Sequence, residues 1–328
     1  MLEERFWAIL PAMNGQHVKV ITNMGAANPV AAAVKVIEIA RELGIKGLRV
    51  AAVTGDDILH ALPEMMELTV IETGRTLKDE PGRIISANAY CGVKGILEAL
   101  RLNADIVMTG RVSDPALFLA PVMHEFGWTT EHWNLLGQGT VLGHLLECAA
   151  QVTGGYYADP GFKDVPDLWN VGFPIAEVAE DGTFTISKLP GTGGLVSTHT
   201  VSEQLLYEIL DPAAYHTPDV IADFSRVFLR QLQPDLVEVY GGTGLPKSGH
   251  LKVSIGLDEG FICEGEISYG GPGAEARAEL AGEIIRKRIE YLKIPVQELR
   301  IDLLGVNSLY PKELARQLSD YDEKRHEI

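Results

Sequence analysis

The chain has 328 residues, of which 46% are hydrophobic and 22% are charged, and its formal net charge is −17. It is about twice as long as a typical domain, so we expect two domains or one large domain with an insertion. The acidic balance argues against nucleic acid and anionic membrane surfaces as partners, because both bind basic faces. An anionic substrate would therefore need a local positive site on this protein.

The three cysteines, Cys91, Cys148 and Cys263, show no spacing typical of a disulfide framework or a zinc motif, so we expect reduced thiols in a cytoplasmic protein. No apolar run reaches the length of a membrane span, and the N-terminal residues lack the layout of a signal peptide. We expect a small-molecule substrate, no nucleic-acid or membrane partner and, on general grounds, a homo-oligomer.

The first part of the chain alternates strands with helices. Apolar runs predict strands at residues 18–22, 48–53, 82–86 and 104–109. A helix at residues 29–43 joins the first two, which makes a βαβ unit with parallel strands. The predicted fold class is therefore α/β, with an N-terminal doubly wound, mostly parallel sheet over residues 1–160. Its last helix is expected at residues 140–152.

From about residue 161 the pattern changes to hairpins and glycine-rich turns. The segment Glu180-Asp181-Gly182 is expected to be a hairpin turn between two strands. Further strands are predicted at 235–240, 251–255, 261–267 and 300–305, and a long helix at 274–292. We expect an α+β second domain over residues 161–310, followed by a charged tail at 311–328.

Polar side chains follow each of the four strands predicted in the first domain. The carboxyl ends of parallel strands share one edge of a sheet, and small-molecule sites form at that edge. The residues expected to converge there are Asn23, Asn28, Asp56, Asp57, Ser86, Asn88, Arg111, Ser113 and Asp114. An alternative, for Asn28, Asp57, Asn88 and Asp114, is that each is only a helix N-cap.

Arg111 is the strongest single candidate in this set, because a guanidinium beside helix N-termini can clamp an anion. Its alternative is a structural ion pair with Asp56, Asp57 or Asp114. The same three carboxylates are candidates for a general acid or base, since a closed cleft raises the pKa of a carboxylate towards the working pH.

The glycine-rich turns give weaker signals. No loop carries a Walker or GxGxxG fingerprint, so no ATP or NAD site is predicted. Gly193 and Gly194, in the turn at residues 191–194, could cradle a phosphate on backbone N–H groups, as could the turn at 270–273. Such turns are also common as plain connections.

A polar stripe runs along the helix predicted at 140–152. It consists of His144, Glu147, Cys148 and Gln151. The favoured interpretation is a helix face that borders the cleft or water. A second is a Cys148 thiolate activated by His144. A metal site ranks last, because two ligands are too few for zinc, and no metal is predicted.

Several longer motifs occur in order along the chain. They are TNMGAANP at 22–29, TGDD at 54–57, SANAY at 86–90, TGRVSD at 109–114, GHLLEC at 143–148, QVTGG at 151–155, GTGGLV at 191–196 and YHTPDV at 215–220. With them the chain resembles the acyclic terpene utilisation family, AtuA type, over residues 1–307. The resemblance implies bacterial breakdown of citronellol- and geraniol-type branched acids as CoA thioesters, with a lyase step on a branched 3-hydroxyacyl-CoA. It supplies no catalytic residues.

Members of that family begin with an extra strand and a glycine-rich turn ahead of the segment where this chain starts, and they continue past residue 307. We therefore expect the first domain to lack an N-terminal strand, in a fragment or a reduced version of the family.

Together these observations predict a lyase or hydrolase of branched-chain acid breakdown that acts on a small carboxylate or acyl-CoA thioester. One alternative is a non-catalytic ligand-binding or scaffold subunit of a catabolic complex. Another is a metal-dependent hydrolase that uses His144 and aspartates.

Overall fold

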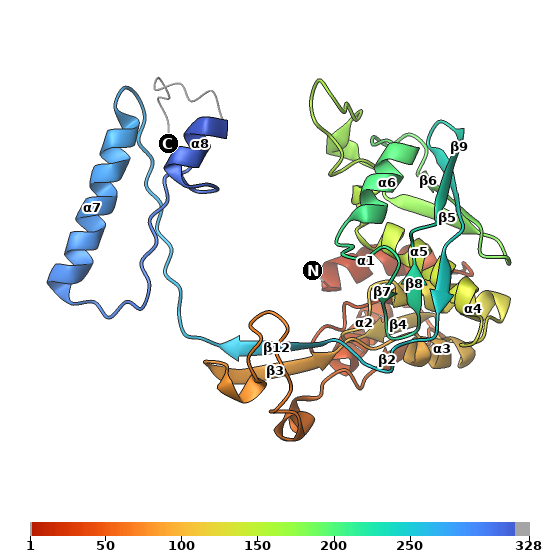
Figure 1. Cartoon of the computed structure of the whole chain (residues 1–328). Coiled ribbons are helices and arrows are strands. Elements are labelled where there is room, and N and C mark those ends of the chain that lie inside the picture. The colour runs from red at the N-terminus through yellow and green to blue at the C-terminus, as the bar shows by residue number, and fades with distance from the viewer. Residues whose placement is uncertain (1, 319–328) are drawn as a thin grey trace. The chain divides into compact units, whose positions relative to one another are not determined.

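The structure, a computed structural model, describes residues 2–318 (Figure 1). The chain divides into two compact units, Met1–Glu259 and Gly260–Ile328. All the predicted site residues belong to the first unit. A further boundary near residue 160, inside that unit, stays a prediction.

A small parallel sheet lies at the centre of the first unit, as the sequence predicts. Its strand order is β1-β4-β2. The strands are β1 (Val20–Thr22), β4 (Ile106–Thr109) and β2 (Val50–Val53). Strand β4 pairs in parallel with both neighbours and is buried along its whole length. A strand that is covered on both faces is typically apolar along its whole length, without alternating polar residues.

Alternate residues of β4 face two different hydrophobic clusters, because successive side chains of a strand point to opposite faces. Ile106 and Met108 pack with α1 (Leu2–Met13) and α2 (Pro29–Glu42). Val107 packs with the other cluster. That cluster includes residues of α3 (Lys94–Arg101), α4 (Ala116–Phe126) and α5 (Trp133–Glu147).

The start of α2 follows from its sequence. Asn28 Oδ1 accepts a hydrogen bond from the N–H of Ala31 at 2.9 Å, and Pro29 occupies the first helical position. The capping alternative for Asn28 is therefore confirmed.

The third predicted strand is real, but its predicted partner is wrong. Strand β3 (Arg83–Ala89) pairs antiparallel with β12 (Val253–Asp258) in a separate two-stranded sheet (Figure 1). Ser86 lies opposite Gly256 in that ladder. The local sequence specifies an extended segment, whereas the partner comes from far along the chain.

Helix α5 begins and ends earlier than the helix expected at 140–152. It is enclosed by its neighbours, since the residues from Leu136 to Leu145 are all buried. It ends at Glu147, and after Cys148 the backbone passes into a short 3-10 turn, Ala149–Gln151. Ala149 takes a positive φ of 48°, which interrupts the helix there.

The rest of the first unit is antiparallel. A four-stranded sheet has the order β5-β6-β10-β9, and a three-stranded sheet has the order β11-β8-β7. The strands are β5 (Pro174–Val178), β6 (Phe184–Lys188), β7 (Tyr215–His216), β8 (Ile221–Asp223), β9 (Phe228–Gln233), β10 (Leu236–Tyr240) and β11 (Thr243–Leu245). The hairpin predicted around residues 180–182 is confirmed as β5–β6. Helix α6 (Thr198–Leu206) begins with a capping box between Ser197 and Thr200.

The second unit contains α7 (Ala274–Leu292) and α8 (Lys312–Leu318). The long helix predicted at 274–292 is confirmed. The strands predicted at 261–267 and 300–305 are wrong, because neither stretch forms a strand ladder in the described structure. Residues 319–328 of the predicted charged tail lie outside the described residues. Among residues 2–318, no helix combines the length and apolar character needed to cross a bilayer.

Two glycines of α5 support a test of its packing. A methyl group at Gly137 would collide with the backbone carbonyl of Thr243 in β11, which cannot move without shifting a strand. We expect Gly137→Ala to lower the free energy of unfolding by about 1–3 kcal/mol in urea titrations, although alanine favours a helix over glycine.

Gly139→Ala is the matched control, since it has the same effect on helix propensity. A methyl group at Gly139 would meet a terminal methyl of Leu119, 2.5 Å away, at the flexible end of a side chain. It should therefore cost less stability than Gly137→Ala. Equal stability of the Gly137 variant and the parent would contradict this close approach of α5 and β11.

Candidate functional site

The loop after β4, residues 110–114, brings three strand ends together. The Asp56 carboxylate, from the loop after β2, is buried at 6% exposure. Its Oδ2 accepts from the backbone N–H of Arg111 at 2.9 Å and from Asn88 Nδ2 at 3.0 Å. Gly110 approaches so closely that a Cβ there would collide with the carboxylate. The ends of β2, β3 and β4 therefore meet.

The end of β3 reaches this edge although β3 is not part of the parallel sheet. The N–H of Cys91 donates to the carbonyl of Arg111 at 3.3 Å, and the N–H of Ser113 donates to the carbonyl of Cys91 at 2.8 Å. Asp57 and Asn88 form an isolated antiparallel bridge. These backbone bonds replace the sheet ladder that the sequence led us to expect, and they place Asn88 at the site.

The Arg111 side chain is held on several sides. Its Nη2 lies 2.5 Å from Asp114 Oδ1, and its Nε and Nη2 donate to the carbonyl of Val112 at 3.0 and 2.8 Å. The guanidinium lies 4.6 Å from the centre of the Tyr90 ring. Within residues 2–318, Nη1 has no hydrogen-bond partner, and the side chain is 29% exposed. Arg111 thus makes the ion pair with Asp114 and keeps a donor group free.

Glu147, the last residue of α5, lies close enough to Arg111 and Asp114 to interact with both charges. Burial raises the pKa of Glu147, and the Asp114 carboxylate raises it further, against the opposing effects of a Cys148 hydrogen bond and of Arg111. Cys148 Sγ donates to Glu147 Oε1 at 3.0 Å. Glu147 was noted in the polar stripe but was not among the predicted catalytic residues. The sequence signal that could have identified Glu147 as a site residue is its position in the GHLLEC motif.

His144 lies in the core rather than on the cleft. It is 2% exposed, and its Nε2 lies 3.0 Å from the carbonyl of Gln204. Its ring packs against Tyr215 and Phe224, with ring centres 5.7 and 5.5 Å away, and those two rings also contact each other. Burial lowers the pKa of His144, which favours the neutral imidazole.

The Cys148 thiol is not activated in this arrangement. Burial, followed by the hydrogen bond to Glu147, raises its pKa to about 12, whereas a thiolate nucleophile needs a lowered pKa. This arrangement therefore does not favour a Cys148 thiolate activated by His144. Among residues 2–318, no group of three or more His, Cys, Asp or Glu side chains could hold a metal ion.

The other polar residues predicted at the sheet edge have local partners. Asp57 is exposed, and its Oδ1 accepts from the N–H of Leu59 at 3.0 Å, but the N-cap residue of the short 3-10 helix that follows, Leu59–Glu64, is Ile58. Asp114 makes no capping bond to α4 and Asn88 none to α3. The carbonyl of Asn23 accepts from the N–H of Ala26 within a turn at the end of β1.

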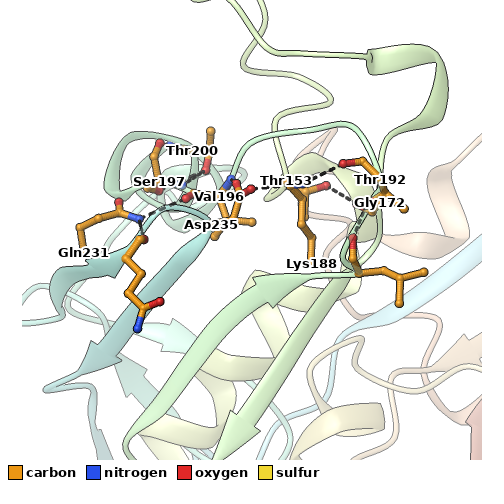
Figure 2. Close-up of polar contacts among 11 residues, drawn as sticks. Thr153, Gly172, Lys188, Thr192, Val196, Ser197, Thr200, Gln231 and Asp235 are labelled. Carbon is orange, nitrogen blue, oxygen red and sulfur yellow. Dashed lines mark hydrogen bonds and ion pairs between the residues drawn. The ribbon is translucent and has the colours of Figure 1, made fainter.

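The turn at residues 191–194 has no free cradle for a phosphate. The N–H of Gly193 donates to the carbonyl of Asn170 at 2.9 Å, and that of Gly194 donates to the carbonyl of Pro166 at 2.8 Å. Figure 2 shows how a polar network fixes the turn. Lys188 Nζ donates to the carbonyl of Thr192 at 2.9 Å and lies 3.2 Å from Asp235 Oδ2. These bonds favour the interpretation that the turn is a plain connection and not a phosphate site.

Sequence reasoning missed Asp219, although it lies in the YHTPDV motif. Both of its carboxylate oxygens accept from the N–H of Val93, at 3.1 Å each, where α3 begins. Burial raises the pKa of Asp219 to about 6, against the opposing effects of the Val93 hydrogen bond and of Lys247. Burial also raises the pKa of the Cys91 thiol, followed by the charges of Asp56 and Asp219, so Cys91 lies near both carboxylates.

The raised pKa of Asp219 predicts a pH dependence of stability. An aspartate in an unfolded chain titrates near about pH 4. Between about pH 4 and pH 6 the folded chain therefore holds a proton at Asp219 that the unfolded chain has lost. The free energy of unfolding should fall as the pH rises through this window, by up to about 1 kcal/mol per pH unit.

Asp219→Asn removes the titrating group and keeps an acceptor for Val93. Urea unfolding at several pH values between 4 and 7 measures the difference in the free energy of unfolding between the parent and the variant. The other titrating groups contribute equally to both proteins, so this difference isolates the contribution of Asp219. The parent should lose stability relative to the variant as the pH rises. Two profiles that run parallel would contradict a raised pKa at this position.

A comparison with protein-family models adds to this geometry. Residues 1–324 match the model described as acyclic terpene utilisation family protein AtuA. No curated protein and no solved structure matches the chain. The family match covers nearly the whole chain, including the loop after β4, the end of α5 and Asp219. The chain therefore belongs to the acyclic terpene utilisation family, and this membership implies a role in acyclic terpene utilisation.

Proposed function

We propose that this protein is an enzyme of branched-chain acid breakdown that acts on a small carboxylate or acyl-CoA thioester at the end of β4. The observation that supports the proposal is the Arg111 guanidinium. It is partly exposed, its Nη1 has no hydrogen-bond partner among the described residues, it pairs with Asp114, and its charge acts on the pKa of Glu147. One cation and two carboxyl groups in a half-buried site suit the chemistry of a carbonyl group.

The reaction we favour is the cleavage of a branched 3-hydroxyacyl-CoA. A carboxylate removes the proton of the 3-hydroxyl group, the bond between carbons 2 and 3 breaks, and the alkoxide carbon becomes a carbonyl. The electron pair of the broken bond passes to the thioester as an enolate, which then takes a proton at carbon 2. The products are a carbonyl compound and a shortened acyl-CoA, so atoms and charge balance without a redox partner.

Arg111 would stabilise the enolate. Negative charge develops on the thioester oxygen as the carbon–carbon bond breaks, and a fixed guanidinium lowers the energy of that state more than that of the neutral substrate. Its contacts with Asp114 and Val112 hold the guanidinium in place before the substrate binds. Preorganisation of this kind avoids the cost of reorienting donors during the reaction.

Asp114 and Glu147 are the carboxyl groups we propose for proton transfer. We propose Asp114, whose Oδ1 lies 2.5 Å from Arg111 Nη2, as the base, and Glu147, whose pKa is raised by burial, as the acid. Two carboxyl groups in different environments can thus take different roles. Asp56 already accepts two hydrogen bonds, and the exposed Asp57 accepts one from a nearby backbone N–H, so we give neither a role in proton transfer.

The test is Arg111→Ala, assayed with a branched 3-hydroxyacyl-CoA by chromatography of the CoA products. We expect turnover to fall about 100-fold or more, as when a donor to a developing oxyanion is lost. Arg230→Ala is the matched control. It removes an exposed arginine that pairs with Glu238 at 2.7 Å on the antiparallel sheet, and it should leave turnover unchanged.

Thermal unfolding of both variants checks that the fold is intact. Normal turnover by folded Arg111→Ala would overturn the assignment of Arg111. A parent protein that binds the thioester but releases no product would favour the alternative of a non-catalytic ligand-binding subunit.

A further inference from the structure

A second cation lies beside the Arg111 site and has no role so far. Lys252 Nζ lies 4.9 Å from the centre of the Tyr90 ring, and the Arg111 guanidinium lies 4.6 Å from the same centre. The electron-rich face of an aromatic ring attracts cations, so both charges lie against the Tyr90 ring.

The strand register fixes the position of Lys252. The N–H of Tyr90 donates to the carbonyl of Lys252 at 2.9 Å, and the next residue, Val253, pairs with Ala89 at the start of the β12–β3 ladder. Lys252 is therefore held opposite Tyr90 by backbone bonds. An exposed lysine would otherwise sample many positions, and this anchoring limits them.

Lys252 lies outside the Arg111–Asp114 ion pair. Asp114 neutralises Arg111, whereas no carboxylate within residues 2–318 forms an ion pair with Lys252. Lys252 thus adds a second cation to a site that also contains the carboxyl groups of Asp56 and Asp114. The segment that leads to Lys252, residues 247–252, also contains Lys247 and His250 and no acidic residue. An ammonium group without an ion-pair partner among residues 2–318 can bind an anion through charge-assisted hydrogen bonds.

We propose that Lys252 is the second cation of the Arg111 site, and that an oxyanion group of the ligand, a carboxylate or a phosphate, binds Lys252 Nζ and Arg111 Nη1 beside Tyr90. This inference rests on the proposed function, because it deepens the ligand recognition of the same site. A lysine ammonium offers three donors to such a group without requiring a planar partner. Lys252 is a binding residue here and takes no part in proton transfer.

The test measures binding rather than turnover. Calorimetry at low salt would use three ligands: a free ten-carbon branched acid, its CoA thioester, and CoA alone. Lys252→Met should weaken the binding of at least one ligand about tenfold, the loss expected for one charge-assisted hydrogen bond. Lys252→Arg, which keeps the charge, should restore most of the affinity.

Lys46→Met is the matched control. Lys46 is an exposed lysine shortly before β2, at the opposite end of the parallel strands, so its loss should change no affinity. An effect of Lys252→Met on the free acid identifies the oxyanion as the substrate carboxylate. An effect restricted to CoA and the thioester identifies it as a phosphate of CoA.

The inference is overturned if Lys252→Met binds every ligand as the parent does, if Lys46→Met weakens binding equally, or if the parent binds none of the three. The proposed function can fail separately, since Lys252-dependent binding without any turnover would uphold this inference and overturn the catalytic role.

Discussion

The Asp56 carboxylate holds three segments of the chain together at the edge of the parallel sheet. It accepts from the backbone of Arg111 and from the side chain of Asn88, and its burial makes each of these bonds costly to lose. Gly110 leaves the space that the carboxylate occupies. The backbone of Arg111 is thereby fixed, and every contact of its side chain depends on that position. The same interaction binds the end of β3, which belongs to another sheet.

Burial and charge act against each other beside Arg111. A guanidinium lowers the pKa of a nearby carboxyl group, but burial outweighs this effect at Glu147 and raises its pKa. Asp114, which is 41% exposed, pairs directly with the cation. Burial thus disposes Glu147 to hold a proton, whereas Asp114 is more exposed and in direct contact with the cation. The chemistry we propose depends on this difference in environment and not on the number of acidic residues.

The sequence predicts the local features of this site well and the long-range ones poorly. Apolar runs identify the parallel strands, and the loop motif after β4 identifies Arg111, because both are signals within a few residues. The pairing of β3 with β12 was missed, since no local pattern shows which distant strand completes a ladder. Glu147 and Asp219 were missed as site residues for a similar reason. Their importance comes from burial, which only the packing of distant elements creates.

The central claim is that the loop at residues 110–114 binds the ligand. Hydrogen–deuterium exchange of the full chain, with and without a branched acyl-CoA, tests it most directly, because exchange reports protection at backbone amides. We expect slower exchange in the peptides that cover residues 88–91 and 110–114 when the ligand is present, and no change at 191–194. Protection confined to residues 191–194, or no protection in the loop after β4 at saturating ligand, would contradict it.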